Sequence, residues 1–461
     1  MPSIFNSLNT ASRAVSANRL GIDVSSHNIA NVNTPGYSRQ RVNITTSHPM
    51  DTIYGAIGTG VDIGGVNRIR NSLLDVQFRN TNHNFGRSSV MEQMFYQVET
   101  IIQEPSDNSI GSLMDDFFNA FSELGGSPED MNLRNVLIQK TGNLSQAFQT
   151  KSGRLREIQS SLRRDAESSI RQVNQISRQI SELNRQIAVS EDQFSSANDL
   201  RDQRDNLLDQ LSEFVQIQSM EDSNGQITVT MNGQMLVSQT QFRELGIESE
   251  GNGNQLSVFV KGSQNQRLDV QTGKLSGIIE MHNTEIASVL DRLDTLAKSF
   301  IDEVNQIHRA GKGLPTGSPP VANTGLNFFT GSDASTIEIS STIRNNTANI
   351  AASNDGSVGN GEAAFAISNL RSQRLLNARS ETFADYYNFT VTDLGTGVQL
   401  AGTDRQNQEL LRDQITNQRE SESGVSLDEE MTNLIKYQRS LEAAARVIGI
   451  VDDILETVIN L

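Results

Sequence analysis

The sequence predicts a mainly α-helical, elongated multidomain protein with paired N- and C-terminal coiled-coil helices, a helical-bundle rod domain and a small inserted β domain. Three observations lead to this fold class. Apolar residues recur at helical spacing over most of the chain, a short central stretch alternates at every second residue, and both ends carry apolar stripes. Only 36% of the 461 residues are apolar and 5% are aromatic, which suits long helices with narrow stripes.

The first element is an amphipathic helix that ends before Pro35, because a proline disfavours the helical conformation in the residue before it. Its apolar residues are spaced by threes and fours, as in a coiled-coil seam, although this spacing equally fits an ordinary core helix. Pro35 and Gly36 then fit a type II turn, in which the glycine takes a positive φ. The stripe consists of Ile4, Leu8, Ala11, Val15, Ile22 and Ile29.

The next part of the chain combines short strands with long helices. Residues 36–70 are expected to form a β-rich connecting segment with glycine-rich turns. Helical spacing follows from about residue 85 to residue 214, with breaks near Pro105 and Gly125. A straight helix over the second half of this stretch would be very long, and we expect it to fold back near Ser196.

A small β domain is predicted between two helical regions, over residues 216–274. Asn232 and Gly233 separate two alternating runs there, which is a strong signal for a hairpin. Helical spacing resumes at residue 275 and stops at Gly311. Residues 311–361 are expected to form a long loop rich in small and polar residues, with a few strand residues from Thr336 to Ser340. Helix returns at Glu362. We expect a terminal domain of residues 1–35 and 424–461, and a rod domain of residues 71–215 and 275–423.

The C-terminal stripe repeats every seven residues to the last turn of the chain. A homodimeric coiled coil would explain the repeat, but further apolar residues broaden the stripe beyond a two-stranded seam, which favours several neighbours. The stripe includes Leu427, Met431, Leu434, Leu441, Ile448, Val451, Leu455 and Val458. Residues 1–70 carry six arginines and three aspartates, whereas residues 421–461 carry eight acidic and three basic residues. Opposite charge favours pairing of the two ends, although solvated faces would carry charge too.

Composition and missing motifs exclude several functions. The chain has no cysteine, so it forms no disulfide and no thiolate metal site. Its net charge of −17 and the absence of a basic run argue against nucleic-acid binding. No cleaved signal peptide or membrane-spanning run is visible. The five histidines lack metal-ligand spacing, and no catalytic or cofactor-binding residues are predicted.

The N-terminal signature, Ser26 to Gln40, resembles that of bacterial flagellar rod, hook and hook-associated proteins. The segments around Gly58, Glu104-Pro105 and Phe117-Phe118 agree with the hook-associated members, as does the C-terminal segment from Ser423. Ser426 replaces the usual asparagine, and a short polar helix cap is still expected there. The signature residues are Asn28, Ala30, Asn31, Thr34, Pro35, Gly36, Tyr37, Arg39, Gln40, Gly424, Leu427, Asp428, Glu429 and Glu430.

The resemblance implies a structural junction protein of the flagellar axis rather than an enzyme. It implies export by the flagellar type III route, a ring of copies at the hook tip, and terminal helices paired into an inner tube. Flagellar hook protein would contact one side and hook-associated protein 3 the other, after a cytosolic export chaperone releases the C-terminal helix. A family outer domain is expected to be absent, because the chain is short. A cytosolic coiled-coil scaffold and an enzyme with a non-local site in the β domain are the alternatives.

Overall fold

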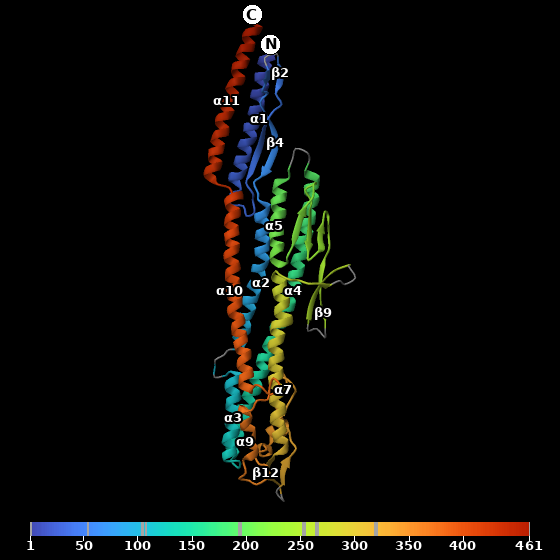
Figure 1. The fold of residues 1–461 in the computed structure, drawn as a ribbon, viewed down its shortest axis with the longest axis vertical. Coiled ribbons are helices and arrows are strands. Elements are labelled where there is room, and N and C mark those ends of the chain that lie inside the picture. The colour runs from blue at the N-terminus through green and yellow to red at the C-terminus, as the bar shows by residue number, and fades with distance from the viewer. Residues whose placement is uncertain are drawn as a thin grey trace.

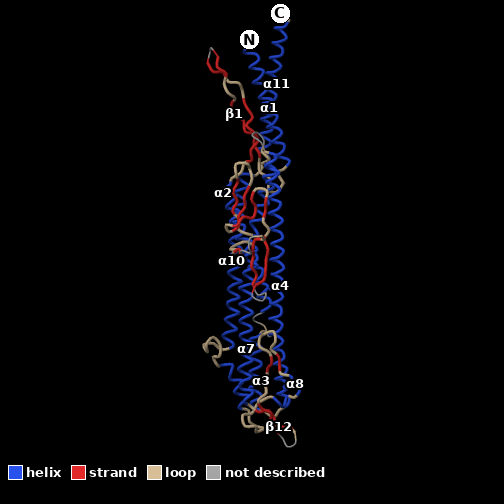
Figure 2. The backbone as a smooth tube through the Cα atoms, turned by 90° about the vertical axis from the view of Figure 1, so that its right-hand side faces the viewer, coloured by secondary structure: helices blue, strands red, loops and turns tan. Residues whose placement is uncertain are grey.

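The protein is a long rod with both chain ends at the same tip (Figure 1). The computed structural model describes residues 2–52, 55–102, 106, 108–191, 196–250, 255–262, 267–317 and 321–460. Helices run along the long axis and several small sheets attach to them, so the predicted mainly α fold with small β insertions is confirmed (Figures 1 and 2). No helix among the described residues is long and apolar enough to cross a membrane.

The two ends of the chain pack against each other. Helix α1 (Pro2–Ala30) lies along α11 (Leu427–Ile459), and the helices approach so closely at Gly21 that an added Cβ atom would be 2.7 Å from the Tyr437 ring. A two-stranded antiparallel ribbon of β1 (Gln40–Thr46) and β4 (Val61–Arg68) covers another side of α1. The hairpin of β2 (Met50–Thr52) and β3 (Gly55–Ile57) extends this ribbon.

Below the tip, α2 (Ser72–Ile102) and α10 (Phe383–Ser423) run side by side in opposite directions (Figure 1). Three arginines of α10, spaced seven residues apart, contact α2. Their three partners on α2 are also spaced seven residues apart. A salt bridge and two cation–π contacts result. The pairs are Arg405 with Glu92, Arg412 with Phe85, and Arg419 with Phe78.

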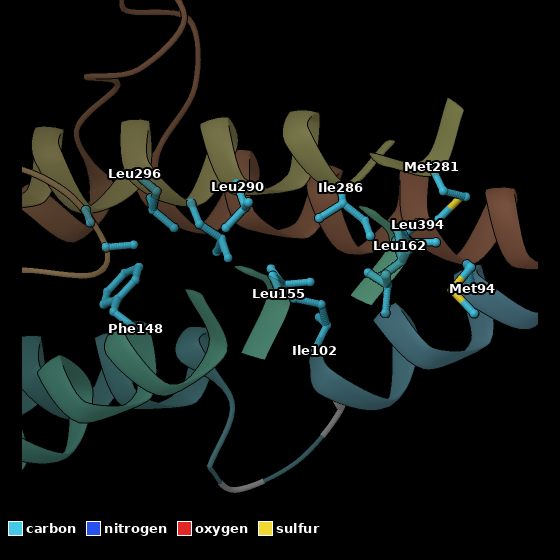
Figure 3. Close-up of a cluster of buried hydrophobic side chains, with 14 of the residues drawn as sticks. Met94, Ile102, Phe148, Leu155, Leu162, Met281, Ile286, Leu290, Leu296 and Leu394 are labelled. Atoms are coloured by element: carbon cyan, nitrogen blue, oxygen red, sulfur yellow. The ribbon is translucent and has the colours of Figure 1, made fainter. Parts of the chain in front are cut away.

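The apolar core lies where α2, α4, α7 and α10 come together, with α3 and α9 at the lower end. In Figure 3, Leu155 of α4 lies near Ile286 and Leu290 of α7, and Leu162 lies near Leu394 of α10 and Met94 of α2. Phenylalanine rings in edge-to-face and tilted contact with Phe117 extend the core downward. The helices are α3 (Ile110–Gly126), α4 (Met131–Ser190), α5 (Asn198–Phe214), α6 (Lys274–Glu280), a π-helix (Met281–Glu285), α7 (Ile286–Ala310) and α9 (Glu362–Asn369).

The inserted β domain packs on α4. It forms one four-stranded sheet in the order β5-β6-β7-β8 and one three-stranded sheet in the order β11-β10-β9. Asn232 and Gly233 both have positive φ at the β6–β7 turn, so the predicted hairpin is confirmed. The strands are β5 (Gln218–Glu221), β6 (Ile227–Met231), β7 (Gln234–Ser238), β8 (Gln241–Phe242), β9 (Leu245–Glu250), β10 (Gln255–Val260) and β11 (Arg267–Leu268).

The lower end of the rod is a packed cap rather than the predicted loop. Phe328, Phe329 and Ile337 from this segment are fully buried. Arg134, also fully buried, bonds to three backbone oxygens, those of Pro128, Thr347 and Ile350. The many small polar residues concealed the few apolar residues that form this core. The elements are β12 (Lys312–Thr316), β13 (Val321–Thr324), β14 (Phe329–Thr330), β15 (Glu338–Ile339), α8 (Ser341–Asn345) and two short 3₁₀ helices (Thr347–Asn349 and Leu370–Ser372).

Other sequence predictions were correct in part. The chain folds back between α4 and α5, and α7 ends at Gly311, as expected. Helix α2 begins at Ser72 rather than near residue 85, because its first turns bury charged and polar groups and so lack an apolar stripe. Ser426 precedes α11 but its side chain makes no capping bond. The expected break at Glu104-Pro105 lies outside the described residues.

His308 makes the stability of the lower cap sensitive to pH. Its Nδ1–H donates to the Leu326 oxygen at 2.7 Å, and the Ala351 N–H donates to its Nε2 at 2.9 Å, so the ring must be neutral. Burial lowers the pKa of His308 to about 4. The unfolded chain therefore binds the proton first, and stability falls as pH drops from about 6.5 toward 4, by roughly 3 kcal/mol.

Urea unfolding of the wild type and of His308→Gln between pH 7.5 and pH 4 tests this. The stability advantage of the wild type should disappear over that range, because the variant has no imidazole to titrate. A substitution at the exposed His48 is the control. Parallel pH profiles for the wild type and the His308 variant would contradict the argument.

Candidate assembly interface and interdomain joint

The signature segment leaves α1 through a tight turn. The Tyr37 N–H donates to the Thr34 oxygen at 3.2 Å, and Gly36 has φ of 78°, as the predicted type II turn requires. Pro35 between them is exposed. Ala30 is the last residue of α1, and the Asn31 side chain donates to the His27 oxygen. The turn therefore reverses the chain and brings Tyr37 back beside the end of α1.

Asn28 is the centre of this segment and is only 1% exposed. Its Oδ1 accepts the Gln40 N–H at 2.9 Å and its Nδ2 donates to the Gln40 oxygen at 2.9 Å. The Tyr37 hydroxyl also donates to Oδ1, at 2.7 Å, and Nδ2 donates to Glu430 of α11 at 3.1 Å. One asparagine thereby joins the helix, the strand that follows it and the other end of the chain. Burial, then Asp199, Asp202 and Glu430, raise the pKa of Tyr37, so its hydroxyl stays protonated.

Arg39 connects the two ends of the chain by charge. Its Nε donates to Glu430 at 2.7 Å, and its guanidinium also pairs with Glu429. Glu430 is 2% exposed, so both of its partners are needed to offset the loss of hydration. The Arg39 N–H donates to the Ser423 oxygen just before Gly424, which ends α10.

The first turn of α11 is acidic. Asp428, Glu429 and Glu430 lie at the helix N-terminus, where the helix dipole favours negative charge. This explains why the signature places acids there, and why the expected Ser426 cap is not required. The complementary charge of the two ends is thus concentrated at one place among the described residues, around Arg39.

A buried cluster of four arginines and four aspartates joins the terminal domain to the rod. Asp202 accepts both the N–H and the hydroxyl of Ser38, at 2.9 Å and 2.8 Å, and pairs with Arg68 at 2.7 Å. Burial alone would raise the pKa of Asp205, but the adjacent arginines outweigh burial and lower it. The cluster consists of Arg68, Arg70, Arg79 and Arg419 with Asp75, Asp202, Asp205 and Asp209.

The sequence did not predict this cluster. Its aspartates on α5 are spaced three and four residues apart. Its arginines lie at the end of β4 and just after it, on α2 and on α10. The spacing of the aspartates on one face of α5 was the available signal. Their partners lie more than a hundred residues away in sequence, so the pairing could not be read locally. Within the described part of the chain, no three or more histidine, aspartate or glutamate side chains are arranged so that they could hold a metal ion.

The residues of the predicted apolar stripes are buried, half-buried or exposed. Ala11 and Val451 are buried between the terminal helices, and several other stripe residues are half-buried. The half-buried residues are Ile4, Leu8, Val15, Ile22, Ile29, Leu434, Leu441, Ile448 and Leu455. The exposed stripe residues are Leu427, Met431 and Val458.

Helix α11 also exposes apolar residues that the sequence analysis did not assign to the stripe. Val447, Ile450 and Ile454 are 42%, 59% and 43% exposed, and with Val458 they line one flank of the helix. The flank of α11 that faces α1 is therefore covered within the chain, whereas a second apolar flank of α11 remains exposed to solvent.

Comparison with known proteins gives consistent matches over the whole chain. The model of the flagellar hook-associated protein FlgK helical domain matches residues 95–329. The models of the flagellar basal body rod FlgEFG protein C-terminal region and of the flagella basal body rod protein match residues 416–461 and 8–37.

Curated relatives are similar over their full length. Flagellar hook-associated protein 1 of Bacillus subtilis (strain 168) is 30% identical over 506 residues, covering 100% of this chain and 99% of the relative. The Escherichia coli (strain K12) protein of the same name is 25% identical, covering 98% and 99%. The solved flagellar hook junction protein FlgK from Burkholderia pseudomallei has a TM-score of 0.64 at 15% identity, covering 76% of this chain and 100% of that one, which supports the fold.

Replacing Glu430 by alanine should open the terminal pair without unfolding the rod. The change removes the buried carboxylate that Arg39 and Asn28 share, at a cost of roughly 3 kcal/mol. Amide hydrogen exchange of residues 427–459 should become at least about tenfold faster, while α4 keeps its protection.

Glu429→Ala is the matched control, because Glu429 is the neighbouring acid on the same arginine and its side chain is 62% exposed. Its loss should cost less than about 1 kcal/mol. Equal acceleration in both variants would mean that Glu430 has no special role.

Proposed function

Because the chain belongs to the flagellar hook-associated protein 1 family, we propose that it is a structural subunit that joins hook to filament in the bacterial flagellum. It assembles at the hook tip as a ring of copies through its paired terminal helices, residues 1–35 and 424–461, which line the inner tube. Its chemistry is assembly rather than catalysis. The rod domain, residues 71–215 and 275–423, surrounds that tube, the segment 36–70 connects the two, and the β domain 216–274 projects from the rod.

The observation that carries this proposal is the unsatisfied apolar flank of α11. Val447, Ile450, Ile454 and Val458 remain exposed although α11 already packs on α1. Fully burying one such side chain contributes about 1.5–3 kcal/mol to the free energy of association. Covering the four half-exposed side chains of this flank therefore contributes several kcal/mol. That is enough to exceed an ordering cost of about 2–5 kcal/mol on docking. Neighbouring terminal pairs in an inner tube offer the matching surface.

The partners follow from the position at the junction. Flagellar hook protein lies on one side of the ring and hook-associated protein 3 on the other. Before assembly, the protein leaves the cell by the flagellar export route, and an export chaperone covers the C-terminal helix. The exposed flank of α11 is the surface that such a chaperone would need to shield.

Placing aspartate at both Ile450 and Ile454 should prevent incorporation, because assembly would then bury two charges. Ile450 is 59% exposed and Ile454 is 43% exposed in the single chain, so the monomer should keep its thermal midpoint. The measurement is the amount of subunit in purified hook–filament structures, with the amount secreted into the medium recorded beside it. We expect at least about a tenfold loss of incorporated subunit, a little over 1.4 kcal/mol.

Met220→Asp is the control, since Met220 is 74% exposed on the β domain. That variant should assemble like the wild type. Normal incorporation of the double aspartate variant would remove the main support for assembly through α11.

A further inference from the structure

The ribbon of the terminal domain ends in a projecting hairpin, and we call residues 48–59, which contain β2 and β3, the arm. At the base of the arm the ribbon is held to α1. Arg13 of α1 donates to Ser47 at 2.7 Å, and a Cβ atom added at Gly60 would be 3.1 Å from Thr10 of α1. Figure 2 shows the arm diverging from α1 as it runs toward the tip of the molecule.

One face of the arm is apolar. The register pairs Met50 with Ile57, which are 40% and 45% exposed. Successive side chains of a strand point to opposite faces, so Asp51 and its partner Ala56 lie on the other face. Residues 48–59 contain no lysine or arginine. A two-stranded hairpin is marginally stable in water unless it packs against a helix or further strands, so the arm needs a surface to cover its apolar face.

The exposed flank of α11 lies at the height of the arm. Helices α1 and α11 run in opposite directions, because both chain ends lie at the tip (Figure 1). Gly21 of α1 packs on Tyr437 of α11. Thr10, at the base of the arm, is eleven residues nearer the tip than Gly21, and Ile448 is eleven residues nearer the tip than Tyr437. The base of the arm is therefore level with Ile448.

The apolar pair of the arm lies slightly nearer the tip than the base. Three residues of extended chain from Ser47 to Met50 cover at most about 10 Å. An α-helix covers about 10 Å in about seven residues. Met50 therefore lies between the level of Ile448 and a level about seven residues nearer the tip. Ile450 and Ile454 of the exposed flank fall within this range.

A single copy does not bring these two apolar surfaces together. Near the tip, the arm and α11 lie on different sides of α1, as the two views agree (Figures 1 and 2). With its own arm present, the flank of α11 still leaves Ile450 59% exposed and Ile454 43% exposed. Contact between an arm and an exposed flank therefore takes two copies.

We propose that the arm of one copy packs with Met50 and Ile57 on the exposed flank of α11 in the adjacent copy. The inference rests on the proposed function, because it takes copies standing side by side with their tips level. A second copy is favoured over another partner because both surfaces belong to this chain, are apolar and lie at one height. Two different surfaces meet, so each copy keeps one of each for its other neighbour, and repeated rotation closes a ring.

Aspartate at neighbouring positions of the arm tests the contact in the full-length chain. Ile57→Asp should lower the amount of subunit in purified hook–filament structures at least about tenfold, because the contact would bury a carboxylate. Ala56→Asp is the matched control and should incorporate like the wild type, since Asp51 already lies on that face. Both positions are exposed in the single chain, so both secreted monomers should keep the thermal midpoint of the wild type.

Introduced thiols identify the partner, because the chain itself has no cysteine. One variant carries Ile57→Cys with Ile450→Cys, and a second carries Ile57→Cys with Ile454→Cys. Oxidation of purified hook–filament structures should give covalent dimers and larger multimers of this chain in at least one of the two variants. The secreted monomers should stay monomeric under the same oxidation. The three single-cysteine variants are the controls and should form no species larger than a dimer.

Three outcomes would overturn the contact between copies and leave the junction function intact. They are equal incorporation of the Ile57→Asp and Ala56→Asp variants, no multimers from either double-cysteine variant in structures that contain the normal amount of subunit, and cross-links only to a chain of different mass. If the wild type itself were secreted but absent from hook–filament structures, the proposed function would fail instead.

Discussion

The structure depends on the three aspartates of α5, Asp202, Asp205 and Asp209, and on the arginines that converge on them. Each arginine comes from a different part of the chain: Arg68 from the end of β4, Arg79 from α2 and Arg419 from α10. A buried charge without its partner costs several kcal/mol, so these segments have a single arrangement in which every charge is paired. The cluster lies where the chain enters and leaves the rod. These charge pairs therefore connect the terminal pair to the rod at this point.

Asparagine side chains on the helices also bind the strands through hydrogen bonds of defined direction. Asn184 is fully buried on α4, donates to the Ile227 oxygen at 2.7 Å and accepts the Ile227 N–H at 3.1 Å. The side-chain amide thus satisfies both backbone groups of the first residue of β6 and fixes the position of that strand on the helix. The other pairs are Asn28 with Gln40, Asn174 with Leu245, Asn283 with Leu256, and Asn305 with Phe329.

Apolar periodicity was enough to predict the parts of the fold that depend on apolar burial. The folding back of α4 onto α5, the hairpin at Asn232 and the end of α7 at Gly311 all followed from spacing and turn residues. The start of α2 did not, because its first turns contact α5 and α10 through arginine, asparagine and phenylalanine faces. The contacts of Asn28 could not be predicted from spacing either. Asn28 bonds to the backbone of Gln40, and a bond to the backbone places no requirement on the partner's side chain.

The terminal domain leaves apolar residues of α11 exposed for a geometrical reason. A pair of helices can bury only the sides that face each other, whereas a stripe as wide as that of α11 needs more than one neighbour to cover it. The rod meets this condition internally, because residues such as Leu155 and Leu290 lie among four helices. Among the described residues, α11 packs along α1 while the ribbon packs on α1, so Ile450 of α11 stays exposed. Since the buried charges already hold this pair along the rod axis, docking with neighbours need not first orient it, and more of the apolar contact energy remains for assembly.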